Sequence, residues 1–350
     1  MNNQLKGFPF ISICMPVRNE SAFIRDTLAQ LIAQDYPEDC FEIIVADGGS
    51  DDATPAIVRE FSYRHPKVIL KNNARRISSA GRNACFKSGK GEIFLVVDGH
   101  CYIPGTDMLK NIVTCFEKSG ADCLGRPQPL NPPDISNFQQ AVALARQSRI
   151  GHGGDSLIYS DFEGFVSPVS HGAVYKRHVF DIIGYVDESF DACEDVEFNF
   201  RVEQAGFRTY MSPSIAVKYY PRQSLRALFS QMTRYGKGRF ALTKKHPQSL
   251  SLNSLIPPTF VLALALIPLF FFTNNDLGLI WILFLCVYLL LILCASVSIC
   301  WKHRFFYFHY LVPVFIAIHL GLGYGFISEL LRSLRWRLLT RQKQDKQKLN

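Results

Sequence analysis

Three uncharged apolar segments near the C-terminus limit what this chain can fold into. They run from Leu255 to Thr273, from Leu277 to Cys300 and from Phe305 to Ile327, and Asp276 lies between the first two. A membrane-spanning helix needs about 20 apolar residues, which each segment supplies. Very hydrophobic core helices are the alternative, but a chain of 350 residues has little interior for three of them in succession. We therefore predict a transmembrane region of two or three spans at 251–330.

Charged residues divide the rest of the chain. Up to Pro247 they are mixed with apolar residues as in globular proteins, which predicts a cytosolic domain at 1–223. Between Ser224 and Lys245 basic residues alternate with Leu, Phe and Met, which predicts an amphipathic helix in the membrane interface at 224–250. From Arg332 onward there are seven Lys or Arg and one Asp. The segment 331–350 is thus a basic tail suited to an anionic membrane face, and we expect no nucleic-acid partner.

The membrane topology has one open point. A cytosolic domain, a loop at 274–276 without Lys or Arg outside, and Lys302 to Arg304 inside obey the positive-inside rule for two spans. A third span would place the basic tail outside. Phe305 to Ile327 therefore either breaks the rule or is re-entrant or interfacial, which its proline and glycines favour. The ten cysteines form no CxxC pair, as expected for a reducing compartment. We predict a multi-pass protein of the cell (inner) membrane.

Before the apolar region, buried-type strands alternate with amphipathic helices, the pattern of an α/β fold with a Rossmann-like sheet. In such sheets ligands bind at the carboxyl ends of the strands. The predicted strands are Phe10 to Val17, Phe41 to Asp47, Lys67 to Lys71 and Glu92 to Val97. The predicted helices are Glu20 to Ala33, Ala53 to Tyr63, Ser78 to Ser88, Val179 to Ile183 and Glu194 to Gln204.

Polar residues follow the first two predicted strands. Pro16, Asn19 and Glu20 lie at the end of the first strand, and Asp47 ends the second, followed by two glycines. Acidic and amide side chains there can bind a base and a ribose, and glycine lets a ligand approach the backbone. Each turn alone is compatible with an ordinary strand end. Two such turns at successive strands favour a nucleotide site.

Asp98-Gly99-His100 follows the fourth predicted strand. A carboxylate and a nearby histidine can hold Mg²⁺ or Mn²⁺ against a diphosphate, although a histidine ligand suits Mn²⁺ better. A solvated turn with a chance histidine is the alternative. We predict Asp98 and His100 as metal ligands.

Glu194 and Asp195 begin a predicted helix. Acidic residues in a first turn can simply interact with the helix dipole. They can also present one carboxylate as a general base, which takes the proton from an attacking hydroxyl group.

These motifs, in this order, resemble glycosyltransferase family 2, the inverting enzymes with a GT-A fold (a nucleotide-diphospho-sugar transferase fold with a mixed sheet). The resemblance covers Ile11 to Arg239. The apolar C-terminus and the Asp98-Gly99-His100-Cys101 segment are similar to membrane-anchored exopolysaccharide members of the succinoglycan-biosynthesis type.

The resemblance implies residue roles. Pro16, Asn19, Glu20 and Asp47 would contact the uridine of a UDP-sugar, with Arg82 near the donor. Asp98 would bind the metal on the diphosphate, Asp195 would be the catalytic base, and Glu194 would shape the acceptor site. The acceptor would be a polyprenyl-diphosphate-linked sugar or a glycan, and membrane lipid would be a further partner.

Gln231-Met232-Thr233-Arg234-Tyr235 resembles the Gln-x-x-Arg-Trp element of cellulose and hyaluronan synthases. Tyr235 replaces the tryptophan, and a tyrosine can still stack on an acceptor sugar. Gln231 and Tyr235 are thus predicted acceptor contacts, while Arg234 either neutralises the leaving diphosphate or contacts lipid headgroups.

Two other functions fit parts of the sequence. A nucleotidyltransferase that makes an activated sugar shares the α/β fold and paired acids, but it needs no membrane segments. A non-catalytic membrane scaffold needs no motifs of this kind. Release of pyrophosphate in place of UDP, or no reaction of any nucleotide sugar, would favour these alternatives.

Overall fold

The computed structural model describes residues 7–152, 156–273, 275–304 and 306–348. The chain forms two compact units. The first comprises Met1–Ile135 and Asp155–Pro221, and the second comprises Ser136–Gly154 and Arg222–Asn350. The four segments predicted from the sequence stay a prediction; the structure groups residues 136–154 with the C-terminal helices.

The first unit is built on an eight-stranded sheet in the order β3-β2-β1-β4-β8-β6-β9-β7. Strands β3, β2, β1 and β4 are parallel, β8 is antiparallel to both β4 and β6, β9 is parallel to β6, and β7 is antiparallel to β9. The strands are β1 (Ile11–Val17), β2 (Phe41–Asp47), β3 (Val68–Asn72), β4 (Ile93–Val96), β6 (Cys123–Gly125), β7 (Gly164–Val166), β8 (Gly172–Lys176) and β9 (Thr209–Met211). A small second sheet pairs β5 (Cys101–Tyr102) with β10 (Lys218–Tyr219).

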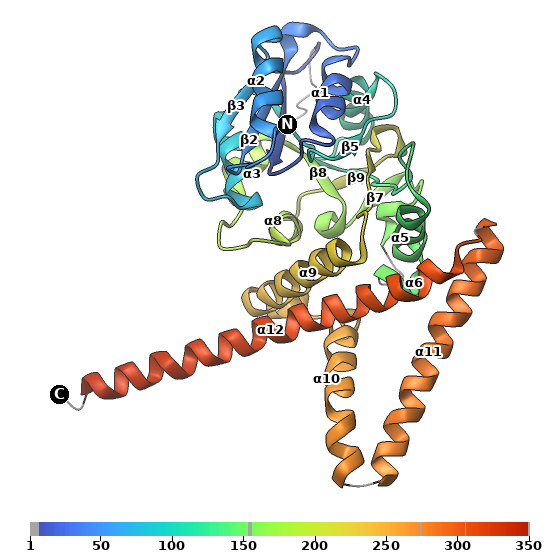
Figure 1. Ribbon diagram of the computed structural model, residues 1–350. Helices are drawn as coiled ribbons and strands as arrows, with labels where there is room; N and C mark the ends of the chain where they lie inside the picture. The colour runs from blue at the N-terminus through green and yellow to red at the C-terminus, as the bar shows by residue number, and fades with distance from the viewer. Residues whose placement is uncertain (1–6, 153–155, 274, 305, 349–350) are drawn as a thin grey trace. The chain divides into compact units, whose positions relative to one another are not determined.

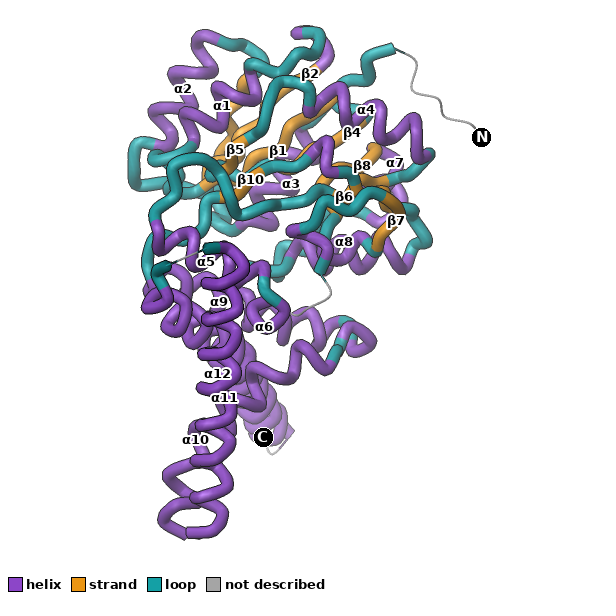
Figure 2. Tube along the Cα trace, turned by 90° about the vertical axis from the view of Figure 1, so that its right-hand side faces the viewer, coloured by secondary structure: helices purple, strands orange, loops and turns teal. Residues whose placement is uncertain are grey.

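Helices cover both faces of this sheet (Figures 1 and 2). Successive strand residues point to opposite faces, so Ile13 joins the core that contains Leu28 and Phe116, whereas Cys14 joins the core that contains Phe86 and Phe198. The first core involves α1 (Ile24–Ile32), α2 (Thr54–Arg64) and α4 (Met108–Ser119); the second involves α3 (Ser78–Ser88), α7 (Arg177–Ile183) and α8 (Glu194–Gln204). Short 3-10 turns lie at Glu38–Cys40, Leu157–Tyr159, Pro168–Ser170 and Pro213–Ile215.

The second unit is helical. It contains α5 (Asn137–Gln147), α6 (Arg149–His152), α9 (Leu225–Lys245), α10 (Leu252–Thr273), α11 (Asn275–His303) and α12 (Phe308–Lys348), with a 3-10 turn at Pro247–Ser249. A capping box in which Ser136 and Gln139 bond each other's backbone starts α5. Helices α10 and α11 form a hairpin, and α12 runs alongside α9 and across this hairpin (Figure 1).

Glycines bring three of these helices into backbone contact. A Cβ atom on Gly236 of α9 would lie 2.1 Å from the carbonyl oxygen of Leu322, and one on Gly325 of α12 would lie 2.1 Å from that of Thr233. On the neighbouring face of α12, a Cβ on Gly323 would lie 2.2 Å from the carbonyl oxygen of Pro257 in α10. Side chains do not fit at these crossings, so the glycines of α12 hold it against α9 and α10.

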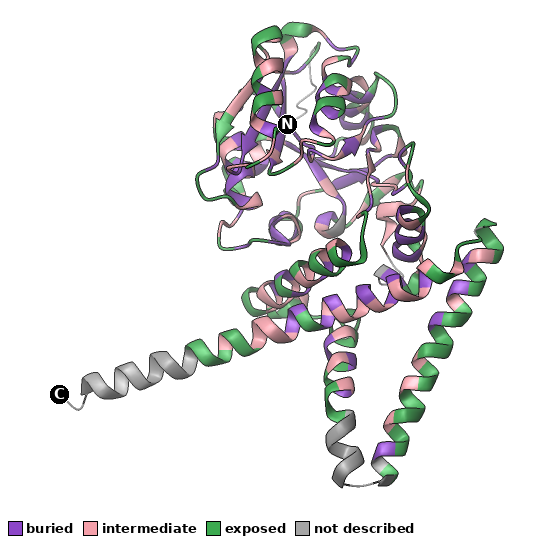
Figure 3. Cartoon of the chain, in the orientation of Figure 1, coloured by how far each residue is buried: buried purple, intermediate pink, exposed green. Residues whose placement is uncertain are grey.

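Two of the described helices are long and apolar enough to cross a membrane, at Gly278–His303 and Phe308–Trp336, and Leu252–Leu266 is a shorter apolar helix. The α11 window is 17% buried, whereas the α12 window is 50% buried, because α12 is covered by other helices (Figure 3). Helix α12 also continues without a break to Lys348, within the predicted basic tail. This continuity disagrees with a re-entrant loop and leaves a span or an interfacial helix.

Candidate active site

Six chain segments end or begin at one edge of the large sheet. Strands β1, β2 and β4 run parallel, with Val17 paired to Asp47 and Cys14 to Val96, so their carboxyl ends meet there. Because β8 is antiparallel to β4 and to β6, the start of β8 and the end of β6 join the same edge, as does the end of β9. Pro16, Asn19, Glu20, Asp47, Asp98 and His100 lie at or just after strands that end at this edge.

The turns after β1 and β2 are bonded to each other. The amide of Gly48 donates to the carbonyl of Val17 at 2.8 Å, the amide of Asn19 donates to Ser50 Oγ at 2.8 Å, and the amide of Asp51 donates to Asn19 Oδ1 at 3.0 Å. Asn19 has a φ of 56°, a conformation that asparagine tolerates. The hydroxyl of Ser50 donates to buried Asp47 at 2.5 Å. The predicted uridine contacts Asn19 and Asp47 therefore also shape these turns.

Pro16 lies under α3. A Cβ atom on Gly81 would be 3.0 Å from Pro16 Cβ, so the glycine allows α3 to sit on the end of β1. From the next position of this helix, Arg82 Nε donates to Glu194 Oε1 at 3.1 Å, and Ser78 Oγ donates to the same oxygen at 2.6 Å. The Arg82 and Glu194 side chains are 13% and 7% exposed. The structure thus brings together the predicted residues Arg82 and Glu194 as a buried ion pair.

The pKa values of both Arg82 and Glu194 depart from their ordinary values. Burial lowers the pKa of Arg82, but the carboxylates of Glu194, Asp195 and Asp98 outweigh that effect and raise it. Burial raises the pKa of Glu194, although Arg82 acts in the opposite direction. Arg82 is therefore a permanent cation among three acidic groups.

Asp195 has a different environment from Glu194. It is half-buried, in the first turn of α8, and its Oδ1 accepts the amide of Val196 at 2.9 Å. A carboxylate at a helix N-terminus is stabilised by the helix dipole. Of the two adjacent acids, the structure ties Glu194 to Arg82 and Ser78 and presents Asp195 at the surface of the site.

The segment before α8 is held against α3 by side chains that were not among the predicted site residues. Asn83 Nδ2 donates to the carbonyl of Val186 at 2.8 Å, and its Oδ1 accepts the amide of that residue at 3.0 Å. Ser79 Oγ donates to the carbonyl of Phe190 at 2.7 Å, and Arg75 binds Glu188 at 2.6 Å. These bonds fix the start of α8 relative to Arg82. Ser79 and Asn83 lie close to Arg82 in the sequence, and this proximity is the one signal that could have identified them.

Asp98, His100 and Glu20 form a second group. His100 Nδ1 lies 2.9 Å from Glu20 Oε1. A Cβ atom on Gly99 would lie 2.8 Å from Glu20 Cγ, so this glycine makes room for Glu20 to reach His100. Glu20, a predicted uridine contact, is thus a partner of His100. Burial raises the pKa of Asp98, but the charges of Arg82, His100 and Arg126 and contact with Tyr219 lower it below its ordinary value.

These residues fit a divalent cation held jointly with a substrate. Within the described residues, no three His, Cys, Asp or Glu side chains gather in a metal-binding group. Asp98 is ionised and half-buried, and a carboxylate that orients one imidazole nitrogen leaves the other directed elsewhere, as in many metal sites. Asp98 and His100 would supply two ligands, and diphosphate oxygens would supply others.

Gln231, Arg234 and Tyr235 lie on α9 in the second unit. Gln231 Nε2 is 3.4 Å from the hydroxyl of Tyr235, one helical turn away. The structure brings these two predicted acceptor contacts together and places Arg234 on the same helix.

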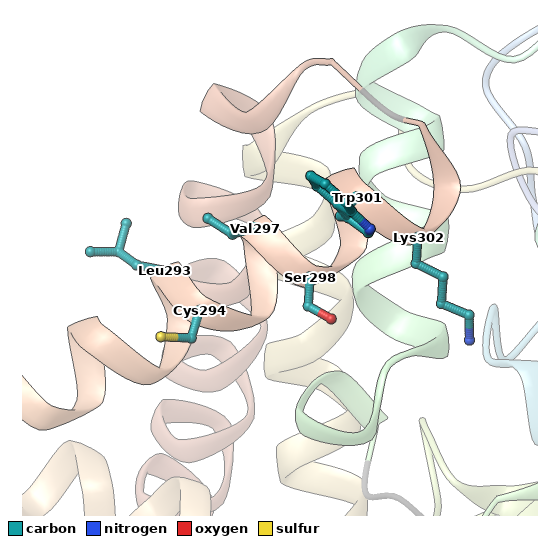
Figure 4. A pocket seen from close by; sticks show the side chains of 6 residues that line it. All are labelled: Leu293, Cys294, Val297, Ser298, Trp301 and Lys302. Atoms are coloured by element: carbon teal, nitrogen blue, oxygen red, sulfur yellow. The ribbon is translucent and has the colours of Figure 1, made fainter.

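A pocket of about 490 Å³ lies against α11 and contains none of the predicted site residues (Figure 4). Leu293 and Val297 line it, and Trp301 and Lys302 mark the end of the helix. Trp301 is 88% exposed. Exposed aliphatic residues that end in Trp and Lys are typical of a lipid-facing helix at the membrane interface.

Comparison with known proteins agrees with this geometry. Residues 12–182 match the family described as Glycosyl transferase family 2, and residues 107–327 match Glycosyl transferase family group 2. The chain is 32% identical over 247 residues to the succinoglycan biosynthesis protein ExoA of Rhizobium meliloti, which covers 70% of this chain and 73% of the relative.

Two further similarities extend this result. A dolichyl N-acetyl-alpha-D-glucosaminyl phosphate 3-beta-D-2,3-diacetamido-2,3-dideoxy-beta-D-glucuronosyltransferase of Methanococcus voltae is 28% identical, covering 67% of this chain and 74% of its own length. The solved structure of the mannosyltransferase PcManGT from Pyrobaculum calidifontis, in complex with GDP-Man and Mn²⁺, superposes with a TM-score of 0.60 at 18% identity, covering 91% of this chain and 88% of that one. The predicted GT-A fold is confirmed.

Proposed function

The chain belongs to glycosyl transferase family 2 and is a glycosyltransferase, and on this basis we propose that it transfers a hexose from a UDP-sugar, with inversion, to a lipid-linked or polysaccharide acceptor. The names of two relatives support the acceptor class. One acts in succinoglycan biosynthesis, and the other acts on a dolichyl-linked sugar phosphate.

The contrast between Glu194 and Asp195 carries this proposal. Glu194 is buried and its Oε1 atom already accepts hydrogen bonds from Arg82 and Ser78, so it is poorly placed to take a proton from an acceptor hydroxyl. Asp195, next to it, is half-buried and in the field of the same arginine. We assign Asp195 as the base that takes the proton from the acceptor hydroxyl while that oxygen attacks the anomeric carbon and UDP leaves. A single displacement inverts the configuration, so an α-linked donor yields a β-linkage.

The predicted donor residues have compatible positions. Asn19 and Asp47 lie in the two bonded turns that would receive the uridine, and Asp98 and His100 would hold Mg²⁺ or Mn²⁺. When bound, the ion neutralises diphosphate charge as the leaving group departs. The Mn²⁺ bound with GDP-Man in the mannosyltransferase of the same fold supports this assignment. On α9, Tyr235 and Gln231 would bind the acceptor sugar, and Arg234 would meet its anionic part or the leaving diphosphate.

For the membrane we propose two spans and one interfacial helix. The α10–α11 hairpin crosses the bilayer, while α12, which the glycine contacts hold alongside basic helix α9, lies in the cytosolic interface. This arrangement keeps the basic tail on the cytosolic side and satisfies the positive-inside rule. A single cysteine at Gln347, in a chain without its native cysteines, should react with an impermeant maleimide in inside-out vesicles and not in intact cells. Labelling from outside would instead establish a third span.

The activity test uses a matched pair of substitutions. Membranes are incubated with radiolabelled nucleotide sugars, and the lipid and polymer fractions are counted. Asp195→Asn should lower the transfer rate about 10²- to 10⁴-fold, the usual contribution of general-base catalysis, and should keep UDP binding by calorimetry. Glu194→Gln is the control: it keeps the shape of the residue and removes only the charge that Arg82 meets. Turnover by Asp195→Asn within about tenfold of wild type would refute the base assignment.

A further inference from the structure

Arg126 in the first unit is a buried cation with only part of its hydrogen-bonding capacity used. It is 1% exposed, and Nη2 donates to the hydroxyl of Tyr219 at 2.9 Å. Its Nε and Nη1 atoms are buried and have no hydrogen-bond partner among the described residues. Burial of a cation with unsatisfied donors is strongly unfavourable. A native protein retains such a group when something outside the folded chain satisfies it.

The position of Arg126 shows where this partner would come from. Arg126 directly follows β6, and its amide donates to the carbonyl of His171 at 2.9 Å, just before β8. Both positions lie at the sheet edge that carries Asp98. His171 Nε2 is likewise buried without a partner among the described residues. Buried polar atoms without partners among the described residues thus lie at the sheet edge that carries Asp98.

Tyr219 connects Arg126 to the metal-binding residues. The guanidinium carbon of Arg126 lies 5.9 Å from the centre of the Tyr219 ring, and that ring lies edge-on to His100, with centroids 5.9 Å apart. The charge of Arg126 also acts on Asp98 and helps to lower its pKa. Arg126 is therefore separated from His100 by one aromatic ring, at the sheet edge that carries Asp98.

Phosphate is the ligand chemistry that fits. Arginine is always protonated and its N–H groups donate well to phosphate oxygens, whose negative charge also offsets the buried cation. The proposed reaction, on which this inference rests, has two sources of phosphate: the diphosphate of the donor and the phosphate of a lipid-linked acceptor. We propose that Arg126 is a phosphate-binding residue of this site, which donates to a substrate phosphate through Nε and Nη1.

The test compares Arg126→Met with Arg177→Met in the full chain in detergent. Arg177 is an exposed arginine at the start of α7, whose Nε and Nη2 donate to the carbonyls of Gly91 and Gly89 at 2.8 and 2.9 Å. Loss of Arg177 should therefore lower the melting temperature without changing the affinity for UDP. Loss of Arg126, whose Nε and Nη1 lack such partners among the described residues, should leave the melting temperature unchanged or raise it.

Calorimetry in the presence of Mn²⁺ then distinguishes the donor diphosphate from the acceptor phosphate as the group that Arg126 binds. If Arg126 binds the donor diphosphate, Arg126→Met weakens UDP binding about 10-fold or more and leaves UMP binding unchanged. If it binds the acceptor, UDP affinity stays at the wild-type value, and the KM for a polyprenyl-phosphate-linked acceptor rises by a similar factor. In either case Arg126→Lys should recover part of the loss.

Three outcomes overturn the proposal: unchanged UDP affinity together with unchanged acceptor KM, equal weakening of UDP and UMP, or a fall in melting temperature like that of Arg177→Met. If Arg126→Met does not fold and Arg126→Gln does not either, the residue is structural. A wild-type chain that transfers no sugar would refute the proposed function, whereas an active wild type with an unaffected Arg126→Met refutes only this inference.

Discussion

The two halves of the large sheet are built differently. In the parallel half, β3-β2-β1-β4, the strand-end turns bond to each other, and Asn19, Asp47 and Glu20 each have partners within the chain. In the mixed half, β8-β6-β9-β7, Arg126 and His171 hold buried polar atoms without partners among the described residues. The parallel half, whose polar side chains have hydrogen-bond partners within the chain, can keep its conformation before a nucleotide binds. In the mixed half, a bound ligand would supply the hydrogen-bond partners that the buried polar atoms lack.

The ion pair between Arg82 and Glu194 joins these halves, and its loss should have the largest effect on stability. Arg82→Met leaves the buried carboxyl of Glu194 without its cation, and we expect a loss of about 3 kcal/mol. Without Arg82, burial raises the pKa of Glu194 further above its unfolded value, so the loss should be greater at pH 7.5 than at pH 5.

Denaturant unfolding of the detergent-solubilised chain, followed by fluorescence, measures this effect. Glu194→Gln with Arg82→Met should recover part of the stability, because no buried charge remains. If Arg82→Met costs no more than Arg126→Met, the contrast between a satisfied and an unsatisfied half is wrong.

Glycine substitutions should differ between the halves by a smaller amount. A Cβ atom on Gly91, before β4, would lie 2.5 Å from the carbonyl oxygen of Ile93 and 2.6 Å from the amide nitrogen of Ser12, both backbone atoms. On Gly172, at the start of β8, it would lie 2.3 Å from Oδ1 of the Asn199 side chain, which can move at the cost of its hydrogen bond from Tyr175. We expect Gly91→Ala to cost about 3 kcal/mol and Gly172→Ala about 1 kcal/mol. Equal losses in the same unfolding assay would argue against a stiffer parallel half.

Substitution of Asp52 should have the smallest effect on stability. Its carboxylate accepts the amides of Ser21 and Thr54 at 3.0 and 2.9 Å and so ties the β2 turn to the start of α1. Burial raises its pKa, but the hydrogen bonds from Thr54 and Ser21 outweigh burial and lower the pKa to about 2. The stabilisation is therefore present above the ordinary value of 3.8 and is lost as the pH falls towards 2.

Asp52→Asn should cost about 1 kcal/mol at pH 7 and show a shallower decline in stability between pH 4 and pH 2 than the wild type. Melting temperatures across this range provide the measurement. Parallel curves for the two proteins would mean that Asp52 carries no such linkage.

The parallel half was largely predictable from the sequence. The predicted bounds Phe41 to Asp47, Ser78 to Ser88 and Glu194 to Gln204 coincide with β2, α3 and α8, because apolar runs or helical spacing end there at turn residues. Strands β6, β7 and β9 have three residues each, and no apolar pattern of that length predicts a strand. Most of the mixed half was therefore not predicted.

The candidate site divides in the same way. Asp98 and His100 follow a predicted strand, so their placement at the sheet edge could be predicted, whereas for Glu194 and Asp195 only the start of a helix could be predicted. The roles of Asp195 as base and of Asp98 and His100 as metal ligands stay predictions. Arg126 follows a strand that the sequence does not mark, and nothing in a Gly-Arg-Pro segment distinguishes a buried cation from a loop residue.

The sequence by itself determined the family, the order of the main elements and the apolar character of the anchor, because these depend on residue spacing over short stretches of chain. Only the tertiary structure decided which side chains pair. Glu20 meets His100 across 80 residues, and Arg82 meets Glu194 across 112. The tertiary structure also determined that α12 packs along α9, because close contact between helices depends on which glycines lie opposite which carbonyls. Partners so distant in the chain are selected by burial and charge in the folded state, which no local pattern records.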